Sequence, residues 1–305
     1  MRVVLTGATG TIGVAVAGAL RARGDEVVAL SRDARRAARR LGAGVDVREW
    51  PVPTRDAPSD VLAGADAVVH MLGEPVAQRW TADAKRRIRD SRVLGTRALV
   101  DALKGLPPER RPRTLLSQSA TGYYGAADAR PLDEAAPAGD GFLADVVTAW
   151  EREAEAAAPF MRVVRLRTGV VLAPDGGALS RMLPFFRLAI GGPVAGGRQY
   201  VPWVHLDDVV RAVLHCLDHS DVEGAVNVTA PEPATNAELS RALGRALQRP
   251  AVLPVPGFAL RLLYGDMAQI VTTGQRVLPA RLQRAGFEFR RPALDAALHD
   301  VLRAA

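Results

Sequence analysis

Short apolar runs alternate with amphipathic stretches along the first two thirds of the chain. Runs typical of buried strands occupy residues 1–6, 25–31, 65–72, 113–119 and 162–167. Between and after them, apolar positions recur at helical spacing in residues 14–23, 81–103, 146–158 and 209–217. Strands separated by helices in this order predict an α/β fold with a doubly wound parallel sheet, the Rossmann arrangement.

The composition changes after Leu172. Glycine-rich segments follow at 174–177 and 191–197, and proline-rich segments follow at 231–233 and 250–256. We therefore expect a sheet domain, residues 1–172, and a smaller C-terminal lobe, mainly residues 173–305, that covers the ligand of the sheet.

The first strand breaks into a glycine turn, Gly7-x-x-Gly10-x-x-Gly13, and a helix follows at once. A dinucleotide-binding site requires this order, because the glycines allow a tight turn and a close approach of the backbone to a pyrophosphate. The phosphates then bind at the N-terminus of the helix. The predicted cofactor contacts in this turn are Gly7, Thr9, Gly10, Thr11, Ile12 and Gly13.

The second strand ends at Ser31-Arg32, where the adenosine ribose is expected. NAD sites usually place a carboxylate here, whereas an arginine suits the 2′-phosphate of NADP because its planar fork pairs two oxygens. Ser31 and Arg32 therefore favour NADP(H). Asp33 lies at about the position of the NAD-type acid, so NAD stays the less favoured alternative.

Ligands of a doubly wound sheet bind at the carboxyl ends of its strands. This rule adds candidates from the ends of three further strands. They are Met71, Leu72, Gly73, Glu74, Ser117, Arg167 and Val170.

Composition and charge exclude several classes of protein. The 305 residues are 48% hydrophobic and carry a net charge of +7, but the basic residues are scattered and no nucleic-acid-reading module accompanies them. No charged leader precedes an apolar stretch, and nowhere do 18 apolar residues run uninterrupted. We expect a cytoplasmic protein with no nucleic-acid or membrane partner, in which Cys216 is a buried small hydrophobe.

Several short strings resemble the extended short-chain dehydrogenase/reductases, the group that includes sugar-nucleotide epimerases. Beside the glycine turn, the strings shared with this group are residues 119–125, 163–171 and 203–208. The last string implies that residues 203–228 return the chain to the sheet. Further strings resemble an atypical epimerase-family subgroup of unknown function: residues 72–74, 79–80, 91–92, 122–125, 150–151, 191–192 and 286–287. For Arg92 the resemblance implies a cofactor contact, and the alternative is a surface ion pair with Asp90 or Asp101.

The proton relay of that superfamily, Tyr-x-x-x-Lys on one helix, is absent from the sequence. None of the four tyrosines has a lysine four positions later, and neither lysine has a tyrosine four positions earlier. Alignment of Trp150-Glu151 with the end of the active-site helix puts Leu143 and Val147 at about the two positions, and a register shifted by one gives Phe142 and Val146, which are also apolar. The chain therefore lacks the lysine that lowers the tyrosine pKa for proton exchange with a substrate.

Other side chains remain as candidates for chemistry. Ser119 keeps the place of the serine that polarises a substrate carbonyl in the family, and Tyr123 and Tyr124 follow it. Their alternative roles are a strand-end hydrogen bond for the serine and wall packing for the tyrosines. The predicted substrate contacts in the second lobe are Gln199, Trp203 and His205.

A metal site is not expected. His205-x-Asp207-Asp208 is the only spacing to consider, and there Asp207 or Asp208 is better explained as the cap of a helix that begins at Val209.

Three functions stay open. The leading one is an NADP(H)-binding reductase-like protein acting on an unknown carbonyl or hydroxyl compound. The others are a non-catalytic NADP(H)-dependent sensor, with partner capture at Phe185-Phe186, and a sugar-nucleotide epimerase, against which the missing relay argues. The sequence identifies neither the substrate nor the oligomeric state, for which a homodimer is one option.

Overall fold

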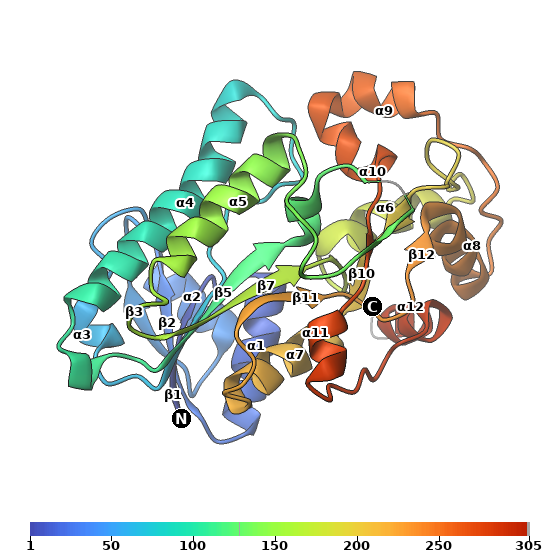
Figure 1. The fold of residues 1–305 in the computed structure, drawn as a ribbon. Helices are drawn as coiled ribbons and strands as arrows, with labels where there is room; N and C mark the ends of the chain where they lie inside the picture. The colour runs from blue at the N-terminus through green and yellow to red at the C-terminus, as the bar shows by residue number, and fades with distance from the viewer. Residues whose placement is uncertain (128, 304–305) are drawn as a thin grey trace.

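A seven-stranded parallel sheet forms the centre of the protein, whose computed structural model describes residues 1–127 and 129–303 (Figure 1). The strand order is β11-β7-β5-β4-β1-β2-β3. The order reverses at β1, where a doubly wound sheet opens its ligand crevice. The predicted fold class is therefore confirmed. The strands are β1 (Arg2–Thr6), β2 (Glu26–Ser31), β3 (Asp46–Glu49), β4 (Ala67–His70), β5 (Thr114–Ala120), β7 (Arg162–Thr168) and β11 (Gly224–Val228).

Helices cover both faces of the sheet because its strands alternate their side chains. In β1, Val3 and Leu5 enter one core, whereas Val4 enters the other. The first core packs against α1 (Thr11–Ala22), α2 (Ala34–Leu41) and α7 (Leu206–Asp218). The second packs against α3 (Ser59–Leu62), α4 (Ala82–Gly105) and α5 (Phe142–Glu155). Figure 1 shows α4 and α5 side by side across the second face.

A smaller lobe packs around a third core. Its helices α6 (Gly177–Arg187), α8 (Asn236–Leu247) and α12 (Leu294–Arg303) bury Leu179, Leu243 and Leu298. Two short strand pairs border this core: β8 (Val170–Leu172) with β10 (Trp203–His205), and β9 (Tyr200–Val201) with β12 (Ala234–Thr235). Before α12, the chain forms β13 (Arg276–Val277), which pairs with β6 (Pro131–Leu132), and then α11 (Ala280–Arg284).

The helices α9 (Gly257–Tyr264) and α10 (Gln269–Thr272), with the 3-10 turn η3 (Gly265–Ala268) between them, stand at the outer end of this lobe (Figure 1). Two further 3-10 turns, η1 (Pro108–Arg110) and η2 (Thr121–Tyr124), flank β5.

Residues 203–228 run from β10 through α7 to β11, which hydrogen-bonds to β7 at the edge of the sheet. The start of α7 differs from the sequence prediction. The helix begins at Leu206, and Nδ1 of His205 accepts the amide hydrogen of Asp207 at 3.1 Å. Asp208 instead accepts the backbone amides of Arg290 and Arg291, at 2.7 and 2.9 Å. The aspartates therefore do not provide the cap.

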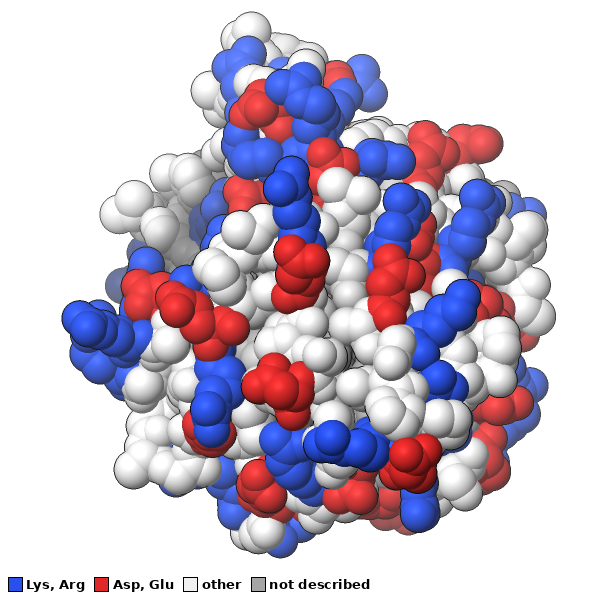
Figure 2. All heavy atoms as spheres, turned by 90° about the vertical axis from the view of Figure 1, so that its left-hand side faces the viewer, with Lys and Arg blue, Asp and Glu red and all other residues white. Residues whose placement is uncertain are grey.

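Charges of both signs are interspersed over the face shown in Figure 2, which offers no continuous basic field. Within residues 1–127 and 129–303, no helix is both long and apolar enough to cross a membrane.

Candidate functional site

The glycine turn joins β1 to α1 under steric conditions that only glycine meets. Gly7 has a φ of +64°, and a Cβ there would lie 2.3 Å from the carbonyl oxygen of Met71. A Cβ on Gly13 would lie 2.4 Å from the carbonyl oxygen of Gly7. The first and third glycines therefore allow strand, helix and the start of the next loop to pack together.

The N-terminus of α1 is left free for an anion. Gly10 is the cap residue and offers no side chain, and the first turn contains no acidic residue. Free amide groups and the positive end of the helix dipole therefore remain for a phosphate. Thr9, Thr11 and Ile12 belong to the same turn. The second lobe reaches this point, since a Cβ on Gly176 would lie 2.7 Å from Oγ1 of Thr11.

The carboxyl end of β2 presents a cation without a competing acid. Oδ1 of Asp33 accepts the amide hydrogen of Arg36 at 2.9 Å and so caps α2. Ser31 lies 3.3 Å from the amide nitrogen of Asp33. Arg32 is exposed, and among the described residues it makes no ion pair or side-chain hydrogen bond. The carboxylate that sequence reasoning weighed against Arg32 is therefore engaged by the helix.

A buried histidine ties β1 and β4 to α4, a feature that sequence reasoning missed. Nδ1 of His70 lies 2.7 Å from Oγ1 of Thr6, and its Nε2 lies 3.0 Å from Oγ1 of Thr96. The Thr6 hydroxyl also accepts the amide hydrogen of Met71 at 3.1 Å. Burial lowers the pKa of His70 to about 3, so the ring is neutral at physiological pH. A lone polar residue inside an apolar strand was the available signal.

The loop after β4 is held by α4. The amide of Glu74 donates to Oγ of Ser91 at 3.0 Å, and Nη1 of Arg92 donates to the carbonyl oxygen of Glu74 at 3.0 Å. A Cβ on Gly73 would lie 2.9 Å from Nη2 of Arg92. Leu72 packs on the same helix, 2.7 Å from where a Cβ on Gly95 would stand.

Arg92 is turned inward, toward this loop and the Trp150 ring, 5.3 Å from the ring centroid. Burial lowers its pKa to about 10, partly offset by the charge of Glu74. Among the described residues it forms no ion pair with Asp90, which pairs with Arg89 at 3.0 Å, or with Asp101. Arg92 is therefore a cation placed beside the proposed cofactor loop and supported mainly by carbonyl oxygens.

A buried ion pair joins β7 to α5. Nε and Nη2 of Arg167 each lie 2.8 Å from a carboxylate oxygen of Glu151, and both side chains are buried. The hydroxyl of Ser119 donates to the same carboxylate at 2.6 Å. Burial disfavours the guanidinium, but the hydrogen bonds and charge of Glu151 outweigh it and raise the pKa of Arg167. Sequence reasoning assigned Glu151 no such role.

The two tyrosines after β5 differ in how their hydroxyls are used. The Tyr124 hydroxyl donates to Oδ1 of Asn227 at 2.7 Å and accepts from Nη1 of Arg167 at 3.1 Å. Burial raises the pKa of Tyr124 to about 12. Tyr123 is half-buried, with its ring stacked 3.4 Å from the Arg167 guanidinium. Within the described chain, its hydroxyl has no hydrogen-bond partner.

The face of α5 that would carry the Tyr-x-x-x-Lys relay is apolar. Leu143 is half-buried and Val147 is buried. A Cβ on Gly122 would lie 3.4 Å from Cβ of Leu143 and 3.7 Å from Cγ2 of Val147. These side chains therefore pack beside η2.

The three predicted substrate contacts in the second lobe serve the fold in this structure. Nε2 of Gln199 donates to two carbonyl oxygens, those of Val194 and Val271, at 2.9 and 2.8 Å. Trp203 is buried in the third core and donates to the Glu232 carbonyl at 3.1 Å. Nε2 of His205 lies 3.3 Å from the carboxylate of Asp300. Their roles toward a substrate stay predictions.

Two predicted cofactor contacts are held within strands. Ser117 is buried in β5 and pairs in register with His70, the last residue of β4, so it lies level with the ends of β4 and β1. Val170 starts β8, and its amide donates to the Pro202 carbonyl at 2.7 Å. The other predicted cofactor contacts lie at or just after the ends of β1, β2, β4 and β7, except Arg92, which lies on α4.

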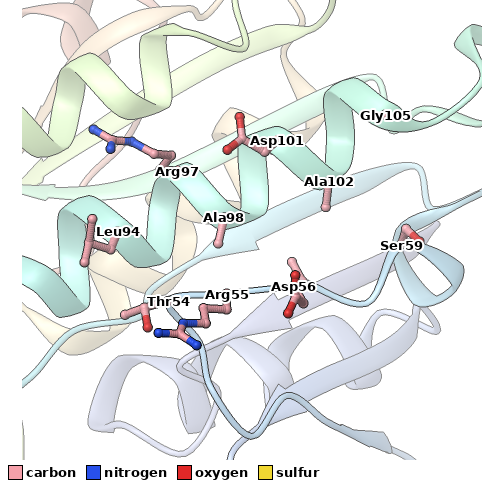
Figure 3. A pocket seen from close by; sticks show the side chains of 11 residues that line it. Thr54, Arg55, Asp56, Ser59, Leu94, Arg97, Ala98, Asp101, Ala102 and Gly105 are labelled. Carbon is pink, nitrogen blue, oxygen red and sulfur yellow. The ribbon is translucent and has the colours of Figure 1, made fainter.

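A cavity of about 580 Å³ lies away from that edge, between the loop after β3 and the outer side of α4 (Figure 3). Its walls include Arg55, Asp56 and Asp101, and none of the predicted cofactor or substrate residues lines it. Arg97 on its wall is already paired with Glu153 at 2.5 Å. We do not assign the candidate chemistry to this cavity.

The fold and the glycine turn together define a doubly wound, dinucleotide-binding type of protein. Residues 3–229 match the model of the NAD dependent epimerase/dehydratase family, and residues 255–301 match a domain of unknown function. The chain belongs to the NAD dependent epimerase/dehydratase family. The resemblance predicted from the sequence is therefore confirmed.

Similar proteins cover almost the whole chain. The crystal structure of the human epimerase family protein SDR39U1 (isoform 2) with NADPH has 33% identity and a TM-score of 0.89, covering 100% of each chain. The chloroplastic SDR39U1 homolog of Arabidopsis thaliana is 38% identical over 99% of this chain and 87% of its own length. The epimerase family protein ML0860 of Mycobacterium leprae is 40% identical over 97% and 94%, respectively.

Proposed function

We propose that the protein binds NADP(H) at the carboxyl edge of the sheet and is a reductase-like protein. The observation that carries this proposal is the uncapped N-terminus of α1, which follows the glycine turn at the end of β1, beside the end of β2, where Arg32 is exposed. The NADPH in the human relative's structure supports the choice of cofactor. Residues 1–172 would form the NADP-binding domain, and most of residues 173–305 the lobe for a substrate or partner.

The residues present fit this cofactor. Amide groups of Thr11, Ile12 and Gly13 at the start of α1 would hold the diphosphate, and Arg32 would hold the 2′-phosphate. NAD is less favoured because the carboxylate of Asp33, which would bond a ribose 2′-hydroxyl, caps α2 instead.

When bound, NADPH would supply the hydride that reduces a carbonyl carbon. The proton for the carbonyl oxygen would come from Tyr123 or from water. Ser119 and Tyr124 are weaker candidates for that step, because their hydroxyls already donate to Glu151 and Asn227. The ring of Tyr123, held against Arg167, is fixed while its hydroxyl stays free within the described residues.

A fluorescence titration with NADPH and NADH tests the cofactor. Arg32→Ala should weaken NADPH binding about 10- to 100-fold, since a hydrogen bond to a charged group contributes about 1.5–3 kcal/mol. NADH binding should barely change. The matched control is Arg113→Ala, an exposed arginine at the opposite end of the sheet with the same change in net charge. Equal and negligible binding of both cofactors would overturn the proposal.

The sensor function is favoured by one observation, the apolar Leu143 and Val147 at the relay positions. A screen of carbonyl compounds with NADPH separates the two functions, since a sensor binds the cofactor and reduces none of them. In the site predicted to bind a partner of the sensor, Phe186 is buried and Phe185 is half exposed. An epimerase activity has no comparable support.

We also propose that the substrate is a small molecule, that the protein binds no nucleic acid and that it is cytoplasmic. These three parts of the proposal rest on the sequence alone. The Arabidopsis relative, by contrast, is named as chloroplastic.

A further inference from the structure

One helix of the second lobe is apolar and almost uncovered. No residue of α9 is buried, and Phe258 and Leu262 are 76% and 80% exposed. Leu263 on the same helix and Ile270 and Val271 on α10 are also exposed. A monomeric protein rarely leaves a large apolar patch of this kind uncovered unless the patch binds something.

The patch is attached to the end of the Rossmann domain where its ligands bind. Nζ of Lys85, in the first turn of α4, lies 2.7 Å from the carboxylate of Asp266 in η3, between α9 and α10. The same Nζ lies 5.4 Å from the centroid of the Phe142 ring, at the start of α5. Beyond α10, Gln275 donates to the carbonyl oxygen of Gly125 at 2.5 Å, just after η2. These contacts fasten η3, which joins α9 to α10, to the N-terminal end of α4, and they fasten the segment after α10 to the end of η2 (Figure 1).

The Rossmann side of this junction is apolar as well. Phe142 packs edge-on against Trp80, with ring centroids 5.0 Å apart, and Leu143 follows it on α5. Of the hydroxyls at the end of β5, those of Ser119 and Tyr124 donate to buried acceptors, which leaves the Tyr123 hydroxyl for a single carbonyl group. A nucleoside diphosphate sugar needs many hydrogen-bond donors, whereas this surface offers rings and alkyl groups.

Building on the proposed NADP(H) function, we propose that the substrate is a carbonyl compound with an apolar body that binds between α9 and the start of α5. The contacts of Lys85 with Asp266 and with the Phe142 ring favour this occupant, because they hold the two apolar surfaces on either side of one side chain, and such a body would cover both and leave its carbonyl at the edge of the sheet. The carbonyl carbon accepts the hydride of NADPH, its oxygen accepts a proton, and the products are an alcohol and NADP⁺. The substrate class is therefore set by α5 and α9 together.

The test compares ligands that share a polar group and differ in apolar length. Binding of decanamide and butanamide to the NADPH-loaded protein is measured by displacement of 1-anilinonaphthalene-8-sulfonate, and UDP-glucose serves as the polar probe. Each buried methylene should strengthen binding about three- to fourfold, so decanamide should bind at least about tenfold more tightly than butanamide. Decanal should likewise be reduced faster than butanal at low concentration.

The double variant Phe258→Ser/Leu262→Ser should remove most of that difference while leaving NADPH affinity unchanged. Val52→Ser is the matched control, because Val52 is a half-exposed apolar residue on the loop after β3. Equal binding of the two amides, or tighter binding of UDP-glucose, would overturn the substrate class while NADPH binding keeps the proposed function. A dimer in sedimentation that the double variant converts to a monomer would also overturn it, by giving the patch to a second copy.

Discussion

The carboxyl edge of the sheet is built in two different ways on its two sides. Around β1 and β2, backbone amides and an exposed arginine remain available, and the glycines keep the space clear. Around β5 and β7, by contrast, the charged groups pair with each other in the Glu151–Arg167 ion pair, and the adjoining face of α5 is apolar. The first side fits a cofactor, whereas the second is consolidated by internal contacts.

This difference explains how a dinucleotide-binding fold can lose its usual proton relay and stay intact. The lysine and tyrosine of a Tyr-x-x-x-Lys relay are polar, so on α5 each would need water or a hydrogen-bond partner. Here Leu143 and Val147 need neither, and the polar groups nearby satisfy one another. The burial of Glu151 is offset by two hydrogen bonds from Arg167, one from Ser119 and a longer contact, 3.5 Å, from Arg165.

The largest expected effect comes from breaking the second side. Arg167→Met removes the two shortest charged contacts of the buried Glu151 carboxylate and leaves it Ser119 and the 3.5 Å contact of Arg165, so the free energy of unfolding should fall by about 3 kcal/mol. Urea unfolding at pH 7 measures this change. The control is Arg97→Met, which breaks the more exposed pair with Glu153 and should cost about 1 kcal/mol or less. Similar losses in the two variants would mean that the buried pair is not the main support of this side.

The first side can be broken at the glycine turn. In Gly13→Ala the new Cβ would lie 2.4 Å from the Gly7 carbonyl oxygen, and such overpacking costs about 1–3 kcal/mol. We expect NADPH binding, followed by fluorescence, to weaken by about 10- to 100-fold if the helix shifts to relieve the clash. Gly18→Ala on the same helix meets no atom within 4 Å and should stabilise the protein by about 0.5–1 kcal/mol. NADPH affinity unchanged in Gly13→Ala would show that the turn tolerates a side chain.

The sequence predicts the first side better than the second for a physical reason. The turn from Gly7 to Gly13 is local, so its steric requirements are written in consecutive residues. The second side depends on contacts between distant segments: Ser119, Glu151 and Arg167 come from β5, α5 and β7. No periodicity places them together, so no pattern in the sequence pairs Glu151 with Arg167.

The cap of α7 shows the same limit on a smaller scale. Asp207 and Asp208 have the composition of a helix start, but the helix begins at Leu206 because His205 accepts the Asp207 amide. The backbone amides of Arg290 and Arg291, which are distant in sequence, donate hydrogen bonds to the Asp208 carboxylate. A local propensity is overridden here by a tertiary contact that the sequence does not reveal.

The stability of the protein should depend on pH through the buried His70, which joins β1 and β4 to α4. Its folded pKa of about 3 lies below the usual 6.5, so only the unfolded state takes up a proton between these values. Stability should therefore be complete above pH 6.5 and fall by about 1.4 kcal/mol per pH unit below it. Urea unfolding at pH 7.0 and 5.5 should show this loss in the wild type and less of it in His70→Gln. The same slope in His70→Gln as in the wild type would contradict the assignment.

The smallest expected effect lies at the Lys85–Asp266 contact, which joins the second side to α9. The hydrogen bond and charge of Lys85 lower the pKa of Asp266, but both groups are accessible to water, so global stability should hardly change in Lys85→Met. Amide hydrogen exchange in residues 257–272 should nevertheless rise by about two- to fivefold, because the ion pair joins this segment to the start of α4. Exchange in α1 should stay constant. About 1 M salt should abolish the difference between wild type and variant, since the pair is screened there. If exchange in α9 is unaffected, other contacts hold the apolar helix beside α5, and the proposed substrate surface does not depend on this ion pair.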